Sequence, residues 1–421
     1  MSTHEDPAAM LHELLEGLAR FGGHGTGVTR LAYSDVWCEA QRWLAGRARG
    51  LGLAATTDAA GNLFFHDPSL VPGEGAPPVL LVGSHLDTVV SGGRYDGACG
   101  AVAGLVAAVA LRARGALPVV GFVTCEEEGS RFPSPFMGAR SLLGQVEEAE
   151  LDAVRDGDGV AWRAALESAR ARGCAAPLAP GPRPFLPLFR SARMLELHIE
   201  QGPVLEAEGL ELGIVTHIAG FRRLRARLTG EARHAGATPM RLRRDALAAA
   251  AEIALAVESY AKSLGEPAVA TAGFARAEPG LYNVIAGACD LGLEVRHVEP
   301  GRPAAMAAEV EQLARGVAER RGVALEIVEV SGQDPTAFAA PLVAAAESLA
   351  KERGLRFRTM ASGAGHDAMV FAHADVPALV VFVPSRGGIS HAPEEYTPPE
   401  QLAAGLGFAI ELARRVSAEQ A

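Results

Sequence analysis

The sequence contains few cysteines, and they do not form the close pairs that bind zinc or cross-link small secreted domains. Five cysteines are scattered along 421 residues, and no CxxC pair occurs among them. This spacing supports neither a zinc finger nor a disulfide framework. We therefore expect reduced thiols and a cytoplasmic protein.

Excess positive charge and long apolar runs are missing as well. Lysine and arginine number 39 against 50 aspartates and glutamates, which gives a net charge of −11. The chain therefore has no general attraction to nucleic acid or anionic lipid. No apolar run approaches the ~20 residues that a membrane-spanning helix needs. Residues 1–21 lack the basic and apolar regions of a signal peptide. We expect neither nucleic-acid nor membrane partners.

The sequence does contain an alternation of short apolar runs with alanine- and leucine-rich helical runs. Hydrophobic residues make up 49% of the chain, as in ordinary folded proteins. Buried strands are predicted at residues 79–83, 119–125, 194–199 and 378–383, and a helix at 100–114. Strands that are apolar throughout and separated by helices indicate a sheet covered on both faces. The predicted fold class is α/β, with a mixed, mostly parallel sheet flanked by helices.

The middle of the chain follows a different pattern. Residues 222–232 and 289–299 alternate between apolar and polar, and helical runs occupy 243–264 and 304–322. Half-exposed strands with amphipathic helices predict a small α+β domain with one solvated sheet face. Because the apolar-strand pattern returns afterwards, we interpret residues 213–330 as a domain inserted into a larger α/β domain.

The ends of the four apolar runs share three histidines and several carboxylates, at the place where ligands bind in open α/β sheets. Each feature alone is more often an ordinary surface group, but four coincidences favour a site. Three adjacent carboxylates after a buried strand resist burial unless a cation lies among them. Imidazole and carboxylate ligands suit zinc, manganese, cobalt or nickel. The residues concerned include His85, Asp87, Asp96, Glu126, Glu127, Glu128, His198, Glu200 and His391.

Three further residues are predicted from position alone. Asp87 follows His85 by two, on the same face of an extended segment, and is expected to fix the tautomer of that imidazole. Arg223 and His366 are candidates for contact with a substrate, although a solvated role is the commoner one for such residues.

Six segments together resemble the amidase, hydantoinase and carbamoylase family of the dinuclear metallopeptidase superfamily. They read "GSHLDTVVSGGRYDG", "EEEGSRF", "LHIEQGPVLE", "GEARHAGATPMRLRRDAL", "SGAGHDA" and "VPSRGGISHAPEEYT". The resemblance covers nearly the whole chain and implies hydrolysis of the ureido (N-carbamoyl) C–N bond of a small carboxylate substrate. Allantoate and N-carbamoyl-L-amino acids are the substrates it implies. It also implies a metal-binding catalytic domain at 1–212 plus 331–421, and a lid at 213–330 through which two chains form a homodimer.

The resemblance implies roles for individual residues. Glu126 would be the general base, and His234 would stabilise the oxyanion, in this superfamily often from the partner subunit. Arg296 would hold the substrate carboxylate, with Gln201 and Asn283 as further contacts. Two divalent ions would be bound by His85, Asp96, Glu127, His198 and His391, with Asp96 as the bridge.

Two other functions are compatible with the same motifs. An aminoacylase or dipeptidase of the superfamily would use the same metal site, and a catalytically inactive binding protein would keep the fold without it. All five implied ligands are present, which favours an enzyme. The segment "SHAPEEYT" has Ala392 where the family commonly has asparagine, which bears on the substrate rather than on the metals.

Overall fold

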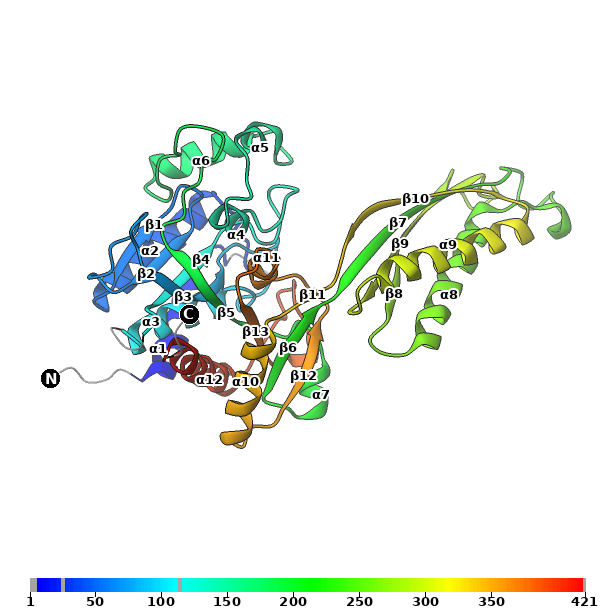
Figure 1. Ribbon diagram of the computed structural model, residues 1–421. Helices are drawn as coiled ribbons and strands as arrows, with labels where there is room; N and C mark the ends of the chain where they lie inside the picture. Colours follow the sequence, from blue (N-terminus) through cyan, green and yellow to red (C-terminus); the bar gives the residue numbers. More distant parts are fainter. Residues whose placement is uncertain (1–5, 24–26, 113–115, 419–421) are drawn as a thin grey trace. The chain divides into compact units, whose positions relative to one another are not determined.

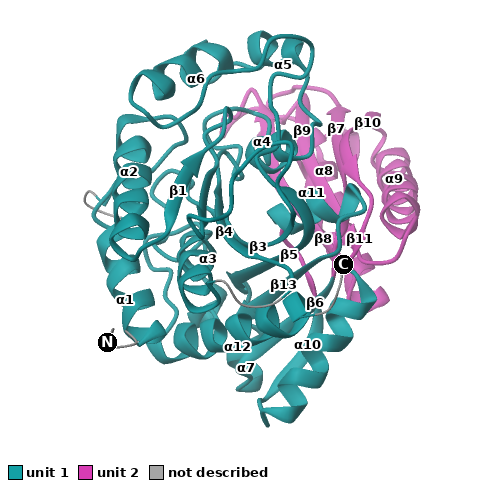
Figure 2. Cartoon of the chain, turned by 60° about the vertical axis from the view of Figure 1, so that its left-hand side comes forward, with its two compact units in different colours: residues 1–216, 338–360, 365–421 teal, residues 217–337, 361–364 magenta. Residues whose placement is uncertain are grey.

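The computed structural model describes residues 6–23, 27–112 and 116–418 (Figure 1). The chain divides into two compact units, which Figure 2 distinguishes by colour. Unit 1 comprises residues 1–216, 338–360 and 365–421, and unit 2 comprises residues 217–337 and 361–364. Compared with the expected insertion at 213–330, unit 2 begins four residues later and its main segment ends seven residues later. That unit 2 acts as a lid or dimerisation domain stays a prediction.

Unit 1 is built on a mixed sheet with strand order β1-β2-β4-β3-β5-β13-β6, and β12 also pairs with β6. The central strands β4, β3, β5 and β13 are parallel, whereas β1, β2 and β6 pair antiparallel. The strands are β1 Ala54–Thr57, β2 Leu63–His66, β3 Pro78–His85, β4 Val119–Thr124, β5 Arg190–Ile199, β6 Leu212–Ile218, β12 Phe357–Ser362 and β13 Ala378–Val383. The predicted α/β class is confirmed, and the four predicted apolar runs form the parallel centre.

Burial explains why these four runs lie in the middle of the sheet. All six residues of β4 and all six of β13 are buried, so neither face of either strand meets solvent. Helix α3, which packs on β3 and β4, has eleven buried residues among thirteen. The helices are α1 Pro7–Leu18, α2 Asp35–Gly50, α3 Ala98–Ala110, α4 Met137–Leu142, α5 Glu148–Ala153, α6 Trp162–Ala171, α7 Val204–Glu208, α10 Ala340–Glu352, α11 Asp367–His373 and α12 Pro399–Ala418, with a 3₁₀ turn η2 Arg386–Gly388.

Unit 2 contains an antiparallel sheet of order β10-β7-β9-β8 with two long helices against one face. Along β7, Leu224 and Leu228 are buried, whereas Arg223 and Arg225 on the alternate face are exposed. Because side chains alternate in a strand, one face packs on the helices and the other is solvated. The elements are β7 Gly220–Thr229, η1 Met240–Leu242, α8 Ala246–Leu264, β8 Val269–Glu278, β9 Ala288–His297, α9 Arg302–Arg321, β10 Ala324–Gln333 and β11 Thr336–Ala337, which pairs with the end of β6.

Within the described residues, every helix is too short or too polar to cross a membrane.

Candidate metal centre

The carboxyl ends of the four parallel strands bring the candidate ligands to one edge of the unit 1 sheet. His85 is the last residue of β3, and His198 is the last but one of β5. The three glutamates 126–128 follow β4, and His391 lies in the segment after β13. Since these strands are neighbours in the order β4-β3-β5-β13, side chains distant in sequence meet here.

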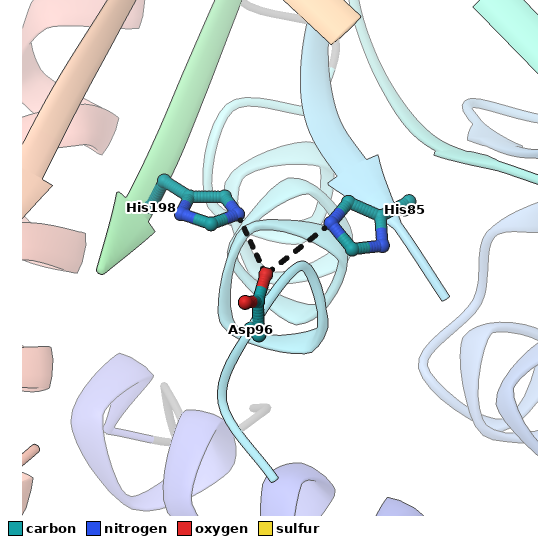
Figure 3. Close-up of side chains that lie close together, drawn as sticks. All are labelled: His85, Asp96 and His198. Atoms are coloured by element: carbon teal, nitrogen blue, oxygen red, sulfur yellow. Dashed lines mark ion pairs between the residues drawn. The ribbon is translucent and has the colours of Figure 1, made fainter. Parts of the chain in front are cut away.

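The first candidate group is formed by His85, Asp96 and His198, which are all buried (Figure 3). Oδ1 of Asp96 lies 3.5 Å from Nε2 of His85 and 3.2 Å from Nε2 of His198. Nδ1 of His85 lies 3.0 Å from the carbonyl oxygen of Asp87, and Nδ1 of His198 lies 2.9 Å from that of Ile199. Because a carbonyl only accepts, both Nδ1 atoms carry a proton, and Nε2 is the ring atom that would bind a metal. Nε2 of His198 accepts the N–H of Gly97 at 3.2 Å.

The second candidate group is formed by Asp96, Glu128 and His391. Nε2 of His391 lies 3.3 Å from Oδ2 of Asp96 and 3.4 Å from Oε2 of Glu128. Gln201 and Ser390 donate to the same Oδ2, at 2.7 and 2.8 Å. Asp96 thus presents one oxygen to each group, which is the arrangement that a bridging carboxylate needs.

In the run of three glutamates, the residue beside His391 is one position later than expected. Oε1 of Glu126 accepts backbone N–H groups of Arg131 and Phe132, at 2.9 and 2.7 Å. Oε2 of Glu127 lies 3.7 Å from Nε2 of His85. Glu128, rather than the expected Glu127, joins Asp96 and His391. The physical reason is that Glu126 has a left-handed backbone, with φ of 51°, which turns the chain directly after β4.

The charges and unsatisfied oxygens of the centre suit a cation. Burial and the neighbouring Asp96 raise the pKa of Glu128 to about 7, and burial holds the pKa of Glu127 well above its usual range. Burial alone would lower the pKa of His85, but Glu127 and Asp96 raise it well above its usual value. Oε1 of Glu128 has no hydrogen-bond partner among the described residues. Crowded buried carboxylates that favour protons would be stabilised by divalent ions, and nitrogen and oxygen donors fit zinc, manganese, cobalt or nickel.

Asp96 is held in place by residues that the sequence did not single out. Glu395 is buried, and its Oε1 accepts the backbone N–H groups of Tyr95 and Asp96, at 2.8 and 3.1 Å. A Cβ at Gly93 would lie 2.0 Å from the Glu395 carboxyl carbon, and a Cβ at Gly97 would lie 2.4 Å from the His85 ring. In the sequence, Glu395 is visible only as one of two adjacent glutamates after His391, and such acidic pairs are usually solvated.

Two predicted residues of unit 1 have different surroundings from those expected. The main-chain carbonyl of Asp87, and not its carboxylate, orients His85, while Oδ2 of Asp87 accepts the N–H of Glu128 at 3.2 Å. The carbonyl of Asp87 lies within hydrogen-bonding distance of Nδ1 of His85, so the carboxylate of Asp87 is not needed to orient the ring. The His366 ring is buried edge-on against His198, with centroids 4.5 Å apart.

The remaining predicted residues belong to unit 2, where they form two separate sets. His234 and Asn283 are exposed and adjacent, since the N–H of Ala235 donates to the carbonyl of Asn283 at 2.9 Å. Arg223 on β7 and Arg296 on β9 lie within this unit's ladder near its opposite end, where β9 finishes. Eight residues of strand separate Ala288 from Arg296, which corresponds to about 26 Å.

Two groups of histidines and carboxylates lie around one shared aspartate at the carboxyl edge of this α/β sheet. Such an arrangement is typical of metal-dependent hydrolases. Residues 81–415 match peptidase family M20/M25/M40, and the chain belongs to this family. The predicted family resemblance is thereby confirmed.

The chain matches relatives and solved structures over almost its full length. The chain is 36% identical to an allantoate amidohydrolase of Bacillus subtilis (strain 168), covering 94% of each sequence. It is also 36% identical to an N-carbamoyl-L-amino-acid amidohydrolase of Paenarthrobacter aurescens, covering 96% of this chain and 97% of the relative. A crystal structure of an amidase of the hydantoinase/carbamoylase family from Burkholderia multivorans superposes with a TM-score of 0.88 at 30% identity, covering 98% of both chains.

Removal of divalent ions is expected to lower the melting temperature, because buried carboxylates would lose their counter-charge. A metal at 100 times its Kd contributes about 2.7 kcal/mol, so a fall of at least several degrees is expected with EDTA and recovery on adding zinc or manganese. Differential scanning fluorimetry measures the change. An Asp96→Asn variant should show a much smaller shift, and a His234→Ala variant the full one. Equal shifts in all three proteins would contradict the site.

Proposed function

We propose that this enzyme hydrolyses the ureido (N-carbamoyl) C–N bond of a small carboxylate substrate and releases ammonia and carbon dioxide. The observation that carries the proposal is the pair of ligand groups sharing Asp96, in a chain 36% identical to relatives named as allantoate and N-carbamoyl-L-amino-acid amidohydrolases over almost their full length. Allantoate and N-carbamoyl-L-amino acids are the proposed substrates. An aminoacylase or dipeptidase activity is the alternative that uses the same centre.

The residues of unit 1 fit two divalent ions. His85 and His198 would hold one ion, Glu128 and His391 would hold the other, and Asp96 would contact both. When bound, the ions would polarise the ureido carbonyl and lower the pKa of the attacking water. This assignment replaces Glu127, the ligand implied by the motif, with Glu128, because Glu128 lies beside His391.

We assign the proton transfers to Glu127 rather than to Glu126. A general base must lie within reach of the proton that it takes. Glu127 faces His85, whereas one oxygen of Glu126 is already engaged by two backbone N–H groups. Glu127 takes a proton as the water oxygen bonds to the ureido carbon, and gives it to the terminal nitrogen as that C–N bond breaks. Ammonia leaves, and the remaining carbamic acid loses carbon dioxide.

His234 is suited to stabilise the negative oxygen of the tetrahedral intermediate. Its Nδ1 accepts the backbone N–H groups of Gly236 and Ala237, each at 3.1 Å. A neutral ring that accepts at Nδ1 carries its proton at Nε2, which leaves an N–H free to donate. One such donor is worth about 3–4 kcal/mol in a water-excluded site.

The spacing within unit 2 supports a homodimer. Asn283 precedes β9, and the start of that strand lies about 26 Å of strand away from Arg296, far more than the length of a small ureido acid. If both sets contact substrate, they must belong to different chains. We therefore propose that each site takes Arg296 from one chain and His234 with Asn283 from the partner subunit.

The free, buried state of all five cysteines supports a reducing compartment, and we propose a cytoplasmic location.

A substrate panel tests the activity directly. The metal-loaded protein is expected to release ammonia from allantoate or N-carbamoyl-L-amino acids, and to release little amino acid from dipeptides or N-acetyl amino acids. Ammonia and amino-acid assays on the same preparations, with zinc, manganese, cobalt or nickel added, separate the two activities. Preferential release of amino acids from dipeptides would select the peptidase alternative.

Substitution of the three consecutive glutamates separates base from ligand. Glu127→Gln should reduce kcat by about 10²–10⁴-fold with both metals retained, because the proton acceptor is lost. Glu128→Gln should lose about one equivalent of metal. Glu126→Gln should keep both metals and more activity than Glu127→Gln. Metal analysis alongside kinetics gives the assignment. The opposite pattern, with metal lost in Glu127→Gln and activity lost in Glu126→Gln, would restore the roles implied by the motif.

Complementation tests the shared site. His234→Ala and Arg296→Ala variants should each be nearly inactive, but co-expression should recover about a quarter of wild-type activity, because each mixed dimer keeps one intact site. Ammonia release by the purified mixture is the measurement. No recovery, despite mixed dimers shown by differently tagged chains, would place both residues in the site of one chain.

A further inference from the structure

A compact cluster on the solvated face of unit 2 holds two arginines and one shared glutamate. Arg223 on β7 and Arg296 on β9 each donate Nε to Glu294, at 2.6 Å, one to each carboxylate oxygen. Both guanidinium carbons lie over the Phe221 ring, 4.7 and 5.5 Å from its centroid. One carboxylate and one aromatic ring therefore fix two cationic side chains side by side.

The cluster keeps hydrogen-bond donors for a further anion. Nη1 of Arg296 donates to the carbonyl of Gly363, within unit 2. Among the described residues, Nη2 of Arg296 and both Nη atoms of Arg223 donate to no other group. The side chains of Arg223 and Arg296 are 50% and 26% exposed, so these donors are accessible to a solute.

The charge of the cluster differs from that around two other arginines of β7. Farther along β7, Arg227 contacts two acids, Glu278 and Asp290. Arg222 also contacts two, Glu329 and Asp334. Arg223 and Arg296 instead share one carboxylate, which leaves a net single positive charge at this end of the sheet. A single carboxylate on a ligand would neutralise it, and a second would meet Glu294 without a counter-charge.

We propose that Glu294 is the residue that makes this enzyme select substrates with a single carboxylate. The inference rests on the proposed function, in which Arg296 binds the substrate carboxylate. Glu294 acts through the arginines, as a positioning residue that also sets the charge they present. It holds both guanidinium groups in place and cancels one of their two charges, so that a monocarboxylate ureido acid completes the balance and a dicarboxylate does not.

A matched pair of ureido acids tests the inference. N-carbamoyl-L-asparagine and N-carbamoyl-L-aspartate have nearly the same shape and differ by one negative charge. For wild-type protein, kcat/KM should favour the asparagine compound. Glu294→Gln keeps an acceptor oxygen but frees a second positive charge, so the preference should shift toward the aspartate compound by about tenfold, through KM rather than kcat. A compound that is not hydrolysed is measured as a competitive inhibitor, with Ki in place of KM.

A double variant and a control distinguish selectivity from structural damage. Arg223→Gln combined with Glu294→Gln restores the single charge and should restore the wild-type preference. Asp290→Asn, which removes a carboxylate from the same sheet face beside Arg225 and Arg227, should leave the preference unchanged. A Glu294→Gln preference within twofold of wild type would overturn the inference. Absence of ammonia release from every ureido acid with wild-type protein would instead overturn the proposed function.

Discussion

The site depends on the placement of one carboxylate between two groups of ligands. Each oxygen of Asp96 faces a different group, so both groups keep their spacing only while this side chain stays in position. Glu395 holds its main chain, and Gln201 and Ser390 hold its outer oxygen. The residues come from segments up to 299 positions apart, and only the adjacency of the parallel strands brings them together.

This arrangement is built at a conformational cost. Glu126, Gln201 and His391 are non-glycine residues with a left-handed backbone, at φ of 51°, 58° and 55°. Such conformations cost on the order of 1–3 kcal/mol each and persist where the surrounding structure determines them. Glu126 and Gln201 follow the ends of β4 and β5, and His391 lies in the segment after β13, so the backbone strain occurs at the candidate centre together with the carboxylates that lack a counter-charge. Divalent ions bound there would offset part of both, because they attract the carboxylates that the turns bring inward.

Periodicity alone was enough to predict the parallel centre of the sheet, because strands buried on both faces read as continuous apolar runs. It also indicated that His85, His198 and His391 would meet. It could not order the three glutamates, since the left-handed turn at Glu126 breaks the alternation of an extended chain. Glu395 was missed because nothing local distinguishes a buried glutamate in a loop from a solvated one. The sharing of Glu294 between two arginines depends on cross-strand register, which one sequence does not reveal.

The imidazoles of His85 and His198 are oriented by carbonyl groups of the main chain, at Asp87 and Ile199. A main-chain group is present whatever amino acid occupies the position, so mutational drift at residues 87 and 199 can alter neighbouring chemistry without removing the acceptor. The orientation of both rings is inherited with the fold itself. Proteins with this fold can therefore differ in substrate while the two imidazoles keep the same orientation.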